Sequence, residues 1–330
     1  MMQDFVPPTL LRNGHLMTIL TAFWPRSFPG LPRAEPREFE IEPGTRLLGE
    51  CNWQQSREER PTLVLVHGLE GSSQASYMLG TAEKAFLAGF NVVRMNQRNC
   101  GGTEHLTPTL YNSGLSGDFR AVVRELAERD ALPEIFAAGF SIGGNLILKM
   151  AGEMDGAAPP QLRAVAAVCP SIDLAACADM VAEPQNYFYE RHFVSSLKSR
   201  MRRKAALFPE RYPLDGMGRV ASVREFDEAI TAPFWGFRGA DDYYARSSAQ
   251  QFLSNIAIPA LILTAQDDPL VPFTPFRDPA IAANPHITLV APRYGGHCGF
   301  FSRRSNSGDR FWAEARLVAF CSQHSQLFGS

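Results

Sequence analysis

The chain has 330 residues, enough for one large α/β domain or two small ones with a sizeable buried core. It carries 32 Lys and Arg against 34 Asp and Glu, a net charge of −2. This balance excludes the basic excess that is typical of nucleic-acid-binding proteins, so we expect a small-molecule partner and no nucleic acid.

The six cysteines are dispersed, without a C-x-x-C pair or a metal-ligand spacing. This pattern favours free thiols in a reducing compartment, which predicts a cytoplasmic location and no metal site. The apolar stretch 16–24 is too short for a membrane-spanning helix and has no basic region before it. We therefore expect neither a membrane anchor nor a secretion signal.

The first 36 residues contain several prolines and predict an arm packed on the core without long regular structure. Residues 13–19, Asn-Gly-His-Leu-Met-Thr-Ile, indicate a specific motif within this arm. A histidine beside a glycine turn, here His15, is more typical of a structural hydrogen bond than of a role near an active site. We favour the structural interpretation.

Strands and helices alternate over the next part of the chain. We expect a strand pair at 37–41 and 47–53, and then buried strands and helices in turn at 62–66, 75–88, 90–95, 118–127, 135–140, 142–150 and 162–168. Asp118 is expected to cap the helix that begins there. The alternation predicts a mostly parallel, doubly wound sheet.

One serine stands between two glycines where an apolar strand passes abruptly into a helix. Gly139 and Gly143 leave room for a tight turn that holds the Ser141 hydroxyl clear of its neighbours, as in a nucleophile elbow. The N-terminus of the following helix points N–H groups at an oxyanion beside the serine, so the backbone N–H of Ile142 is a candidate donor. A Gly-x-Ser-x-Gly pattern alone is a weak signal, because a glycine-rich turn is the alternative.

A second glycine-flanked turn, His67-Gly68-Leu69, follows the strand 62–66. Its position makes the backbone N–H of Leu69 the other candidate oxyanion donor. An ordinary strand-to-helix loop is the alternative. The loop 97–103 is expected near the same site, and we interpret its Cys100 as a packed thiol and not as a nucleophile.

Between 171 and 254 buried-strand runs are absent, and we expect a helical cap with a return segment, inserted into a core formed by 37–170 and 255–330. Residues 191–204 predict a helix that carries six Lys or Arg. The simplest interpretation is a solvated lid helix. A sharper hypothesis is that its basic face makes a weak peripheral contact with an anionic membrane surface.

A carboxylate and a histidine follow the last buried strands, 258–265 and 287–291. Asp267 and Asp268 come directly after the first of these strands, and His297 lies among glycines after the second. Imidazole titrates near neutral pH and can take the proton of a serine hydroxyl, while an aspartate orients the ring. We prefer Asp268 because it lies further past the strand, and Asp267 remains the alternative.

Four motifs in this order, the elbow, the His-Gly-Leu turn, the Asp-Asp-Pro exit and the Gly-Gly-His loop, resemble the α/β hydrolase superfamily. More narrowly the chain is similar to the YheT-like esterases over almost its whole length, including 13–18, 67–73, 139–145 and 241–244. It departs from the family at Arg98-Asn99-Cys100, where relatives tend to read Arg-Gly-Cys.

The resemblance implies hydrolysis of carboxylic esters with small or medium acyl chains, through a Ser141–His297–Asp268 triad and without a cofactor. Transfer of an acyl group to an alcohol and cleavage of phospholipids are the alternatives that the family offers. A non-catalytic binding module is disfavoured, because all three triad residues are present. The resemblance names neither the substrate nor the oligomeric state.

Overall fold

The described residues, 4–212, 214–303 and 310–328 of this computed structural model, form an eight-stranded sheet with the order β1-β2-β4-β3-β5-β6-β7-β8. The β1–β2 and β2–β4 pairs are antiparallel, and all later pairs are parallel. This confirms the predicted sheet. The strands are β1 (Glu35–Glu42), β2 (Thr45–Asn52), β3 (Thr62–Val66), β4 (Asn91–Met95), β5 (Ile135–Phe140), β6 (Leu162–Val168), β7 (Ala260–Leu263) and β8 (Ile287–Val290).

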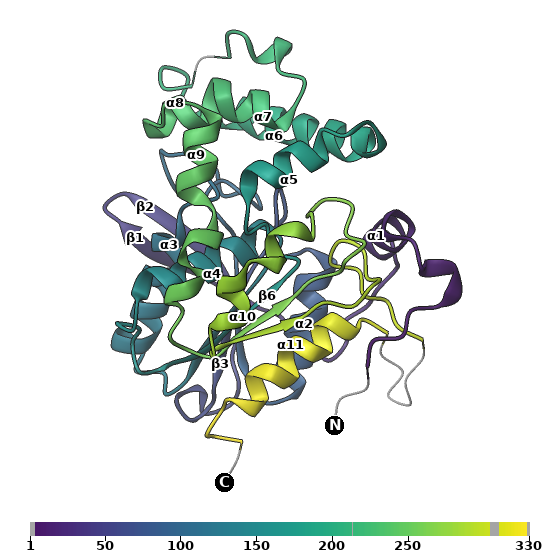
Figure 1. The fold of residues 1–330 in the computed structure, drawn as a ribbon. Coiled ribbons are helices and arrows are strands. Elements are labelled where there is room, and N and C mark those ends of the chain that lie inside the picture. Colours follow the sequence, from purple (N-terminus) through teal and green to yellow (C-terminus); the bar gives the residue numbers. More distant parts are fainter. Residues whose placement is uncertain (1–3, 213, 304–309, 329–330) are drawn as a thin grey trace.

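Helices cover both faces of the sheet (Figure 1). Alternate residues of β3 face opposite layers: Leu63 and Leu65 pack toward α2 (Ser76–Leu87) and α11 (Trp312–Gln323). Val64 and Val66 pack in the other core, which is covered by α3 (Ser116–Arg124), α4 (Ile142–Met154) and α10 (Pro279–Ala283). Burial on both faces explains why the central strands are continuously apolar.

A group of helices lies beyond the carboxyl ends of the parallel strands, at the top of Figure 1. We call residues 174–247 the cap. Its helices are α5 (Leu174–Val181), α6 (Tyr187–Leu207), α7 (Val223–Phe226), α8 (Ala232–Trp235) and α9 (Ala240–Ser247). Apolar side chains of α6, among them Val194, Leu197 and Met201, form a small core with Phe226.

The basic residues of α6 do not form one face. Arg200 and Lys204 are buried, and the ammonium group of Lys204 donates to Asn99 Oδ1 and to the carbonyl oxygen of Glu104, at 2.7 and 2.8 Å. Arg202 and Arg203 stay exposed, and Arg203 pairs with Glu104. The expectation of a single solvated basic face is therefore wrong for Arg200 and Lys204, which hold the cap onto the loops below it.

The N-terminal arm contains a helix that the sequence analysis did not predict, α1 (Gly14–Ala22). The side chain of Asn13 caps it by accepting a hydrogen bond from the backbone N–H of Leu16 at 3.0 Å. A Cβ atom on Gly14 would lie 1.8 Å from the carbonyl oxygen of Asp267. Only glycine lets this helix approach the loop that follows β7 so closely.

Asp118 does not cap α3, contrary to the prediction. The helix begins at Ser116, and the carboxylate of Asp118 accepts two hydrogen bonds from the buried guanidinium of Arg98, at 2.6 and 2.7 Å. No helix within the described ranges has the length and apolar character needed to cross a bilayer.

Candidate active site

Ser141 lies at a strained turn between β5 and α4. Its backbone has φ 54° and ψ −121°, a conformation that side chains with a Cβ rarely adopt. A Cβ on Gly139 would lie 2.1 Å from the carbonyl oxygen of Gly143, and one on Gly143 would lie 2.4 Å from that of Val66. A side chain at either glycine would therefore clash with the backbone of this turn.

The turn after β3 lies next to this elbow. A Cβ on Gly68 would be 3.1 Å from Ser141 Cβ, so the glycine brings the two backbones close together. His67 is fully buried, and burial lowers the pKa of its imidazole to about 4. The neutral ring accepts a hydrogen bond from the N–H of Gln97 at 3.1 Å through Nε2, and its Nδ1 lies 2.7 Å from the carbonyl oxygen of Gly68. His67 thus fixes the turn that carries Leu69.

Asp268 and His297 form a hydrogen-bonded pair. The Nδ1 atom of His297 lies 2.8 Å from Oδ2 of Asp268. The other carboxylate oxygen of Asp268 accepts hydrogen bonds from the backbone N–H groups of Leu270 and Val271, at 2.8 and 3.1 Å. With both oxygens engaged, the carboxylate can orient the ring so that Nε2 is left free to accept a proton.

Asp267 has a different partner. Its Oδ1 accepts a hydrogen bond from the backbone N–H of Gly296 at 2.9 Å, and its Oδ2 is buried without a partner among the described residues. Burial raises the pKa of Asp267 above its ordinary value. The structure therefore brings Asp268, and not Asp267, to the imidazole of His297, while Asp267 shapes the loop that presents it.

The electrostatics of His297 follow from this pairing. Burial disfavours the imidazolium form, but the Asp268 carboxylate and the Cys298 sulfur together outweigh burial, and the pKa of His297 lies well above its ordinary value of 6.5. A base with a raised pKa has a stronger tendency to take the proton of a serine hydroxyl.

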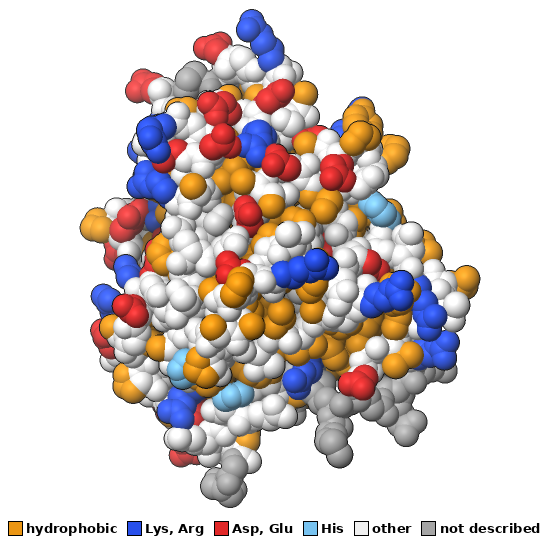
Figure 2. All heavy atoms as spheres, viewed as in Figure 1, with side chains coloured by type: hydrophobic (Ala, Val, Ile, Leu, Met, Phe, Trp, Pro, Cys, Tyr) orange, Lys and Arg blue, Asp and Glu red, His pale blue; other side chains and the backbone are white. Residues whose placement is uncertain are grey.

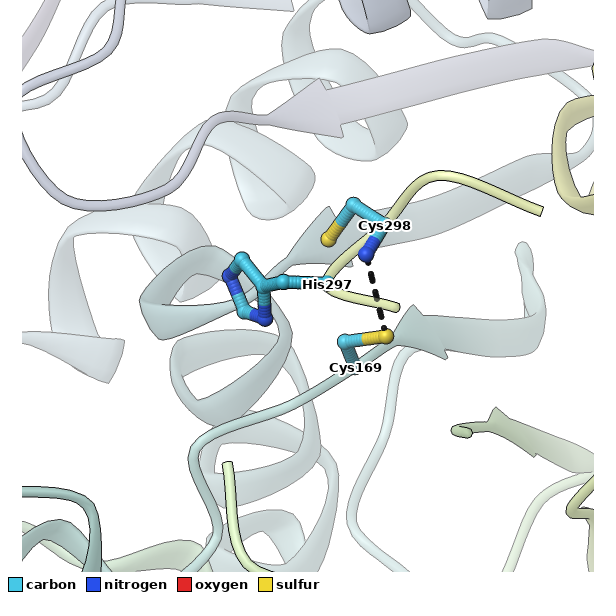
Figure 3. A group of neighbouring side chains, drawn as sticks. All are labelled: Cys169, His297 and Cys298. Atoms are coloured by element: carbon cyan, nitrogen blue, oxygen red, sulfur yellow. Dashed lines mark hydrogen bonds between the residues drawn. The ribbon is translucent and has the colours of Figure 1, made fainter. Parts of the chain in front are cut away.

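Two thiols lie beside His297 (Figure 3). The backbone N–H of Cys298 donates to Sγ of Cys169 at 3.3 Å, and the two sulfurs and one ring nitrogen of His297 all lie within 4.8 Å of one another. Among the described residues this is the group whose atoms are close enough to hold a metal ion. Asp268 already orients the same imidazole beside Ser141. We therefore interpret the two thiols as neighbours of the candidate base and not as a metal site.

Two cavities meet at Ser141 and His297, and Leu69 lines both. The inner cavity, about 780 Å³ with its open part included, extends under the cap and is also lined by Ile142, Arg200, Tyr243 and Tyr244. The outer cavity, about 1800 Å³ with its open part included, runs between α1, α2 and the start of α6. Ser141, His297, Leu69 and Ile142 therefore each line at least one cavity at the carboxyl edge of the sheet, where α/β folds bind ligands, whereas Asp268 and the alternative Asp267 line neither of these two cavities.

Sequence reasoning missed three features of this site. The backbone N–H of His297 donates to the hydroxyl of Thr18 at 2.8 Å, and the ring of His15 stacks on Tyr189 at the outer cavity. Their signal was the motif at 13–19, which we interpreted as structural. Buried Arg200 pairs with Glu70 at 2.5 Å and lies 3.9 Å from the ring centroid of Tyr111, and only the fold could bring these residues together.

Comparisons with known proteins show the family of the chain. Residues 61–303 match a family profile described as the alpha/beta hydrolase fold. The chain is 30% identical over 316 residues to the Escherichia coli K12 protein YheT, which bears the name of an esterase, and the match covers 95% of this chain and 92% of that protein.

A mouse protein named phospholipase ABHD3 is 33% identical over 242 residues, 73% of this chain. The chain matches 58% of that relative's length. Among solved structures, the Pyrococcus furiosus esterase Pf2001 superposes with a TM-score of 0.59 at 15% identity and covers 98% of both chains, a likeness of fold alone.

Proposed function

The chain belongs to the α/β hydrolase fold family, in its YheT-like branch, and on that premise we propose that it is a serine hydrolase. It cleaves carboxylic esters of small or medium acyl chains through an acyl-enzyme intermediate. The observation that carries this proposal is the 2.8 Å contact between His297 Nδ1 and Asp268 Oδ2, with the His297 ring facing the same cavities as Ser141.

The proposed reaction has two halves. His297 takes the proton of Ser141 through Nε2 as the serine oxygen attacks the ester carbonyl, and it then gives this proton to the departing alcohol. Asp268 holds the tautomer and stabilises the imidazolium. Water then attacks the acyl-enzyme with His297 again as base, which releases the acid and restores Ser141.

The oxyanion that forms in each half is held by the backbone N–H groups of Leu69 and Ile142. Leu69 follows the turn that His67 fixes, and Ile142 is the first residue of α4, whose N-terminus favours negative charge. Preorganised donors of this kind typically contribute a factor of about 10² to 10³ in rate each.

The two cavities support esters with a sizeable group on each side of the reacting carbonyl. The inner cavity lies under the cap, and the outer cavity gives room for a second group; the lining of both cavities is mostly apolar. Lipid esters, including phospholipids, meet this requirement, and one relative is named a phospholipase. An apolar outer cavity also favours an alcohol as acyl acceptor in competition with water, which is the acyltransferase alternative.

The test uses p-nitrophenyl butyrate and a fluorophosphonate probe. We expect the wild-type protein to hydrolyse the ester and to be labelled at Ser141, and Ser141→Ala to lose both while it keeps its circular dichroism spectrum. Near wild-type turnover by Ser141→Ala would refute the assignment. Added ethanol separates the alternatives, since an acyltransferase diverts the acyl group into the ethyl ester.

A further inference from the structure

The exposed apolar side chains are concentrated at one place. Among the described residues, 13 large apolar side chains are exposed, and eight of them belong to residues 6–24 or 187–188. Residues 15–26 of the N-terminal arm and residues 185–193 around the start of α6 contribute side chains to the lining of the outer cavity, whereas Val6 and Leu10 do not line it. Exposed apolar side chains that gather in one patch mark a contact surface.

Three of these side chains also line the outer cavity, and we call them the apolar rim: Ile19, Phe23 and Phe188. Phe23 is 82% exposed and Phe188 is 80% exposed. Leu16, Ile19 and Phe23 recur along α1 and its end at the spacing of one helical face. Leu16 is exposed as well, so among the described residues nothing covers this face of the helix fully.

We propose that the apolar rim inserts into a lipid surface and that the outer cavity opens onto that surface. A protein partner or a second copy seated on the rim would close the cavity that leads to Ser141. A lipid surface instead solvates the apolar side chains and can supply ester molecules through the same opening. An amphipathic face of this kind lies in the interface and does not span the bilayer.

The electrostatic surroundings agree with this orientation. Arg12 and Arg191 are exposed at the two segments that carry the rim, and Figure 2 shows basic side chains beside apolar ones on the side of the molecule where α1 lies. Phospholipid headgroups are favourable neighbours for arginine. Because apolar insertion supplies most of the binding, the contact should survive salt, unlike a contact through exposed charges alone.

The inference rests on the proposed function in one respect, namely that the lipid surface supplies ester substrate to Ser141. The test of lipid binding itself does not require turnover. Ser141→Ala protein is sedimented with phosphatidylcholine vesicles, with and without phosphatidylglycerol, in 0.1 M and 0.5 M NaCl. We expect binding at both salt concentrations. In the same background, Phe23→Ser and Phe188→Ser should each weaken binding about tenfold or more, because each loses the burial of a large apolar side chain.

Leu87→Ser is the matched control. Leu87 is 69% exposed at the end of α2, while the cavity is lined by Ser76 and Tyr77 at the start of that helix. The control should bind vesicles like the parent. Absence of vesicle binding, binding unchanged in the Phe23 and Phe188 variants, or equal loss in Leu87→Ser overturns the proposal.

A concentration-dependent dimer in gel filtration that is lost in Phe23→Ser, without vesicle binding, also overturns it and assigns the rim to self-association. Failure of the proposed function gives a different result. In that case the wild-type protein lacks esterase activity and fluorophosphonate labelling, whatever the vesicles show.

Discussion

The backbone N–H of His297 donates a hydrogen bond to the Thr18 hydroxyl across 279 residues of sequence. The same hydroxyl donates to the carbonyl oxygen of Gly14 inside α1 at 2.7 Å. One threonine therefore ties the N-terminal helix to the loop that carries the candidate base. This link makes α1 part of the scaffold of the site.

Thr18→Val tests this positioning role. The substitution keeps the shape of the side chain and leaves the N–H of His297 without its partner, at a cost of about 1–3 kcal/mol in the free energy of unfolding. We expect kcat for p-nitrophenyl butyrate to fall with little change in KM. Thr21→Val is the control, because Thr21 makes the same kind of bond to the Met17 carbonyl oxygen but none to the His297 loop. Equal kcat values in the two variants would contradict the role.

Two variants distinguish the roles of the adjacent residues Asp267 and Asp268. Asp268→Asn removes the charge that orients His297, and kcat should fall by about 10⁴-fold. Asp267→Asn keeps an oxygen for the Gly296 N–H, and its effect on kcat should stay within about tenfold, the rate equivalent of one hydrogen bond. Steady-state kinetics on purified variants measure both values. The reverse order of effects would exchange the roles of the two residues.

The pH profile follows from the raised pKa of His297. The imidazole must be neutral to act as a base, so kcat/KM is lost as the pH falls through the pKa of His297 in the free enzyme. Asp268 raises that pKa, and the acid limb should therefore have its midpoint above 6.5, the ordinary value. A midpoint at or below 6.5 would mean that burial outweighs the combined effect of the Asp268 carboxylate and the Cys298 sulfur.

Gly143→Ala should prevent the elbow from closing. The added methyl group would meet the backbone oxygens of Val66 and His67 at 2.4 and 2.5 Å, which cannot move without disturbing β3. We expect a lower melting temperature and loss of fluorophosphonate labelling. Gly117→Ala in α3 is the matched control, since nothing lies within 4 Å of its added Cβ and alanine favours the helix by up to about 1 kcal/mol. A fully labelled and stable Gly143→Ala protein would contradict the account.

Cys298 should be the thiol that reacts first with iodoacetamide. The nearby Cys169 sulfur and the His297 imidazole lower the pKa of Cys298 to about 6, while burial raises the pKa of Cys51 and of Cys100 to about 12. Alkylation at pH 7 should map to Cys298 by mass spectrometry, slow as the pH falls through 6, and inhibit hydrolysis, because Cys298 lines the outer cavity. Cys298→Ser should resist this inhibition.

The sheet could be predicted from the sequence because its strands are short apolar runs buried on both faces. The run 62–66 coincides with β3, and the run 135–140 coincides with β5. The elbow was predictable for a similar reason, since Gly139 and Gly143 are needed for a local turn. Local sterics can be read directly from the order of residues.

Other features depend on contacts between distant segments. Aspartate is a residue type that commonly caps helices, but the carboxylate of Asp118 accepts hydrogen bonds from the buried guanidinium of Arg98 instead. From the sequence alone, Arg200 and Lys204 are expected to be solvated charges. In the fold, the loops below the cap bring Glu70 to Arg200 and Asn99 to Lys204. Whether Asp267 or Asp268 lies against the imidazole depends on how the loops pack, which residue spacing does not determine.

The bond between Thr18 and His297 joins segments that are far apart in the sequence, and we expect it to form late in folding. A contact that closes a loop of this length forms late, because non-local contacts cost more chain entropy than the pairing of neighbouring strands. In a refolding experiment the circular dichroism of the sheet should therefore return before fluorophosphonate labelling does. On the ribosome, Ser141 emerges before Asp268 and His297, so the serine is synthesised ahead of the carboxylate and the imidazole that are proposed to activate it.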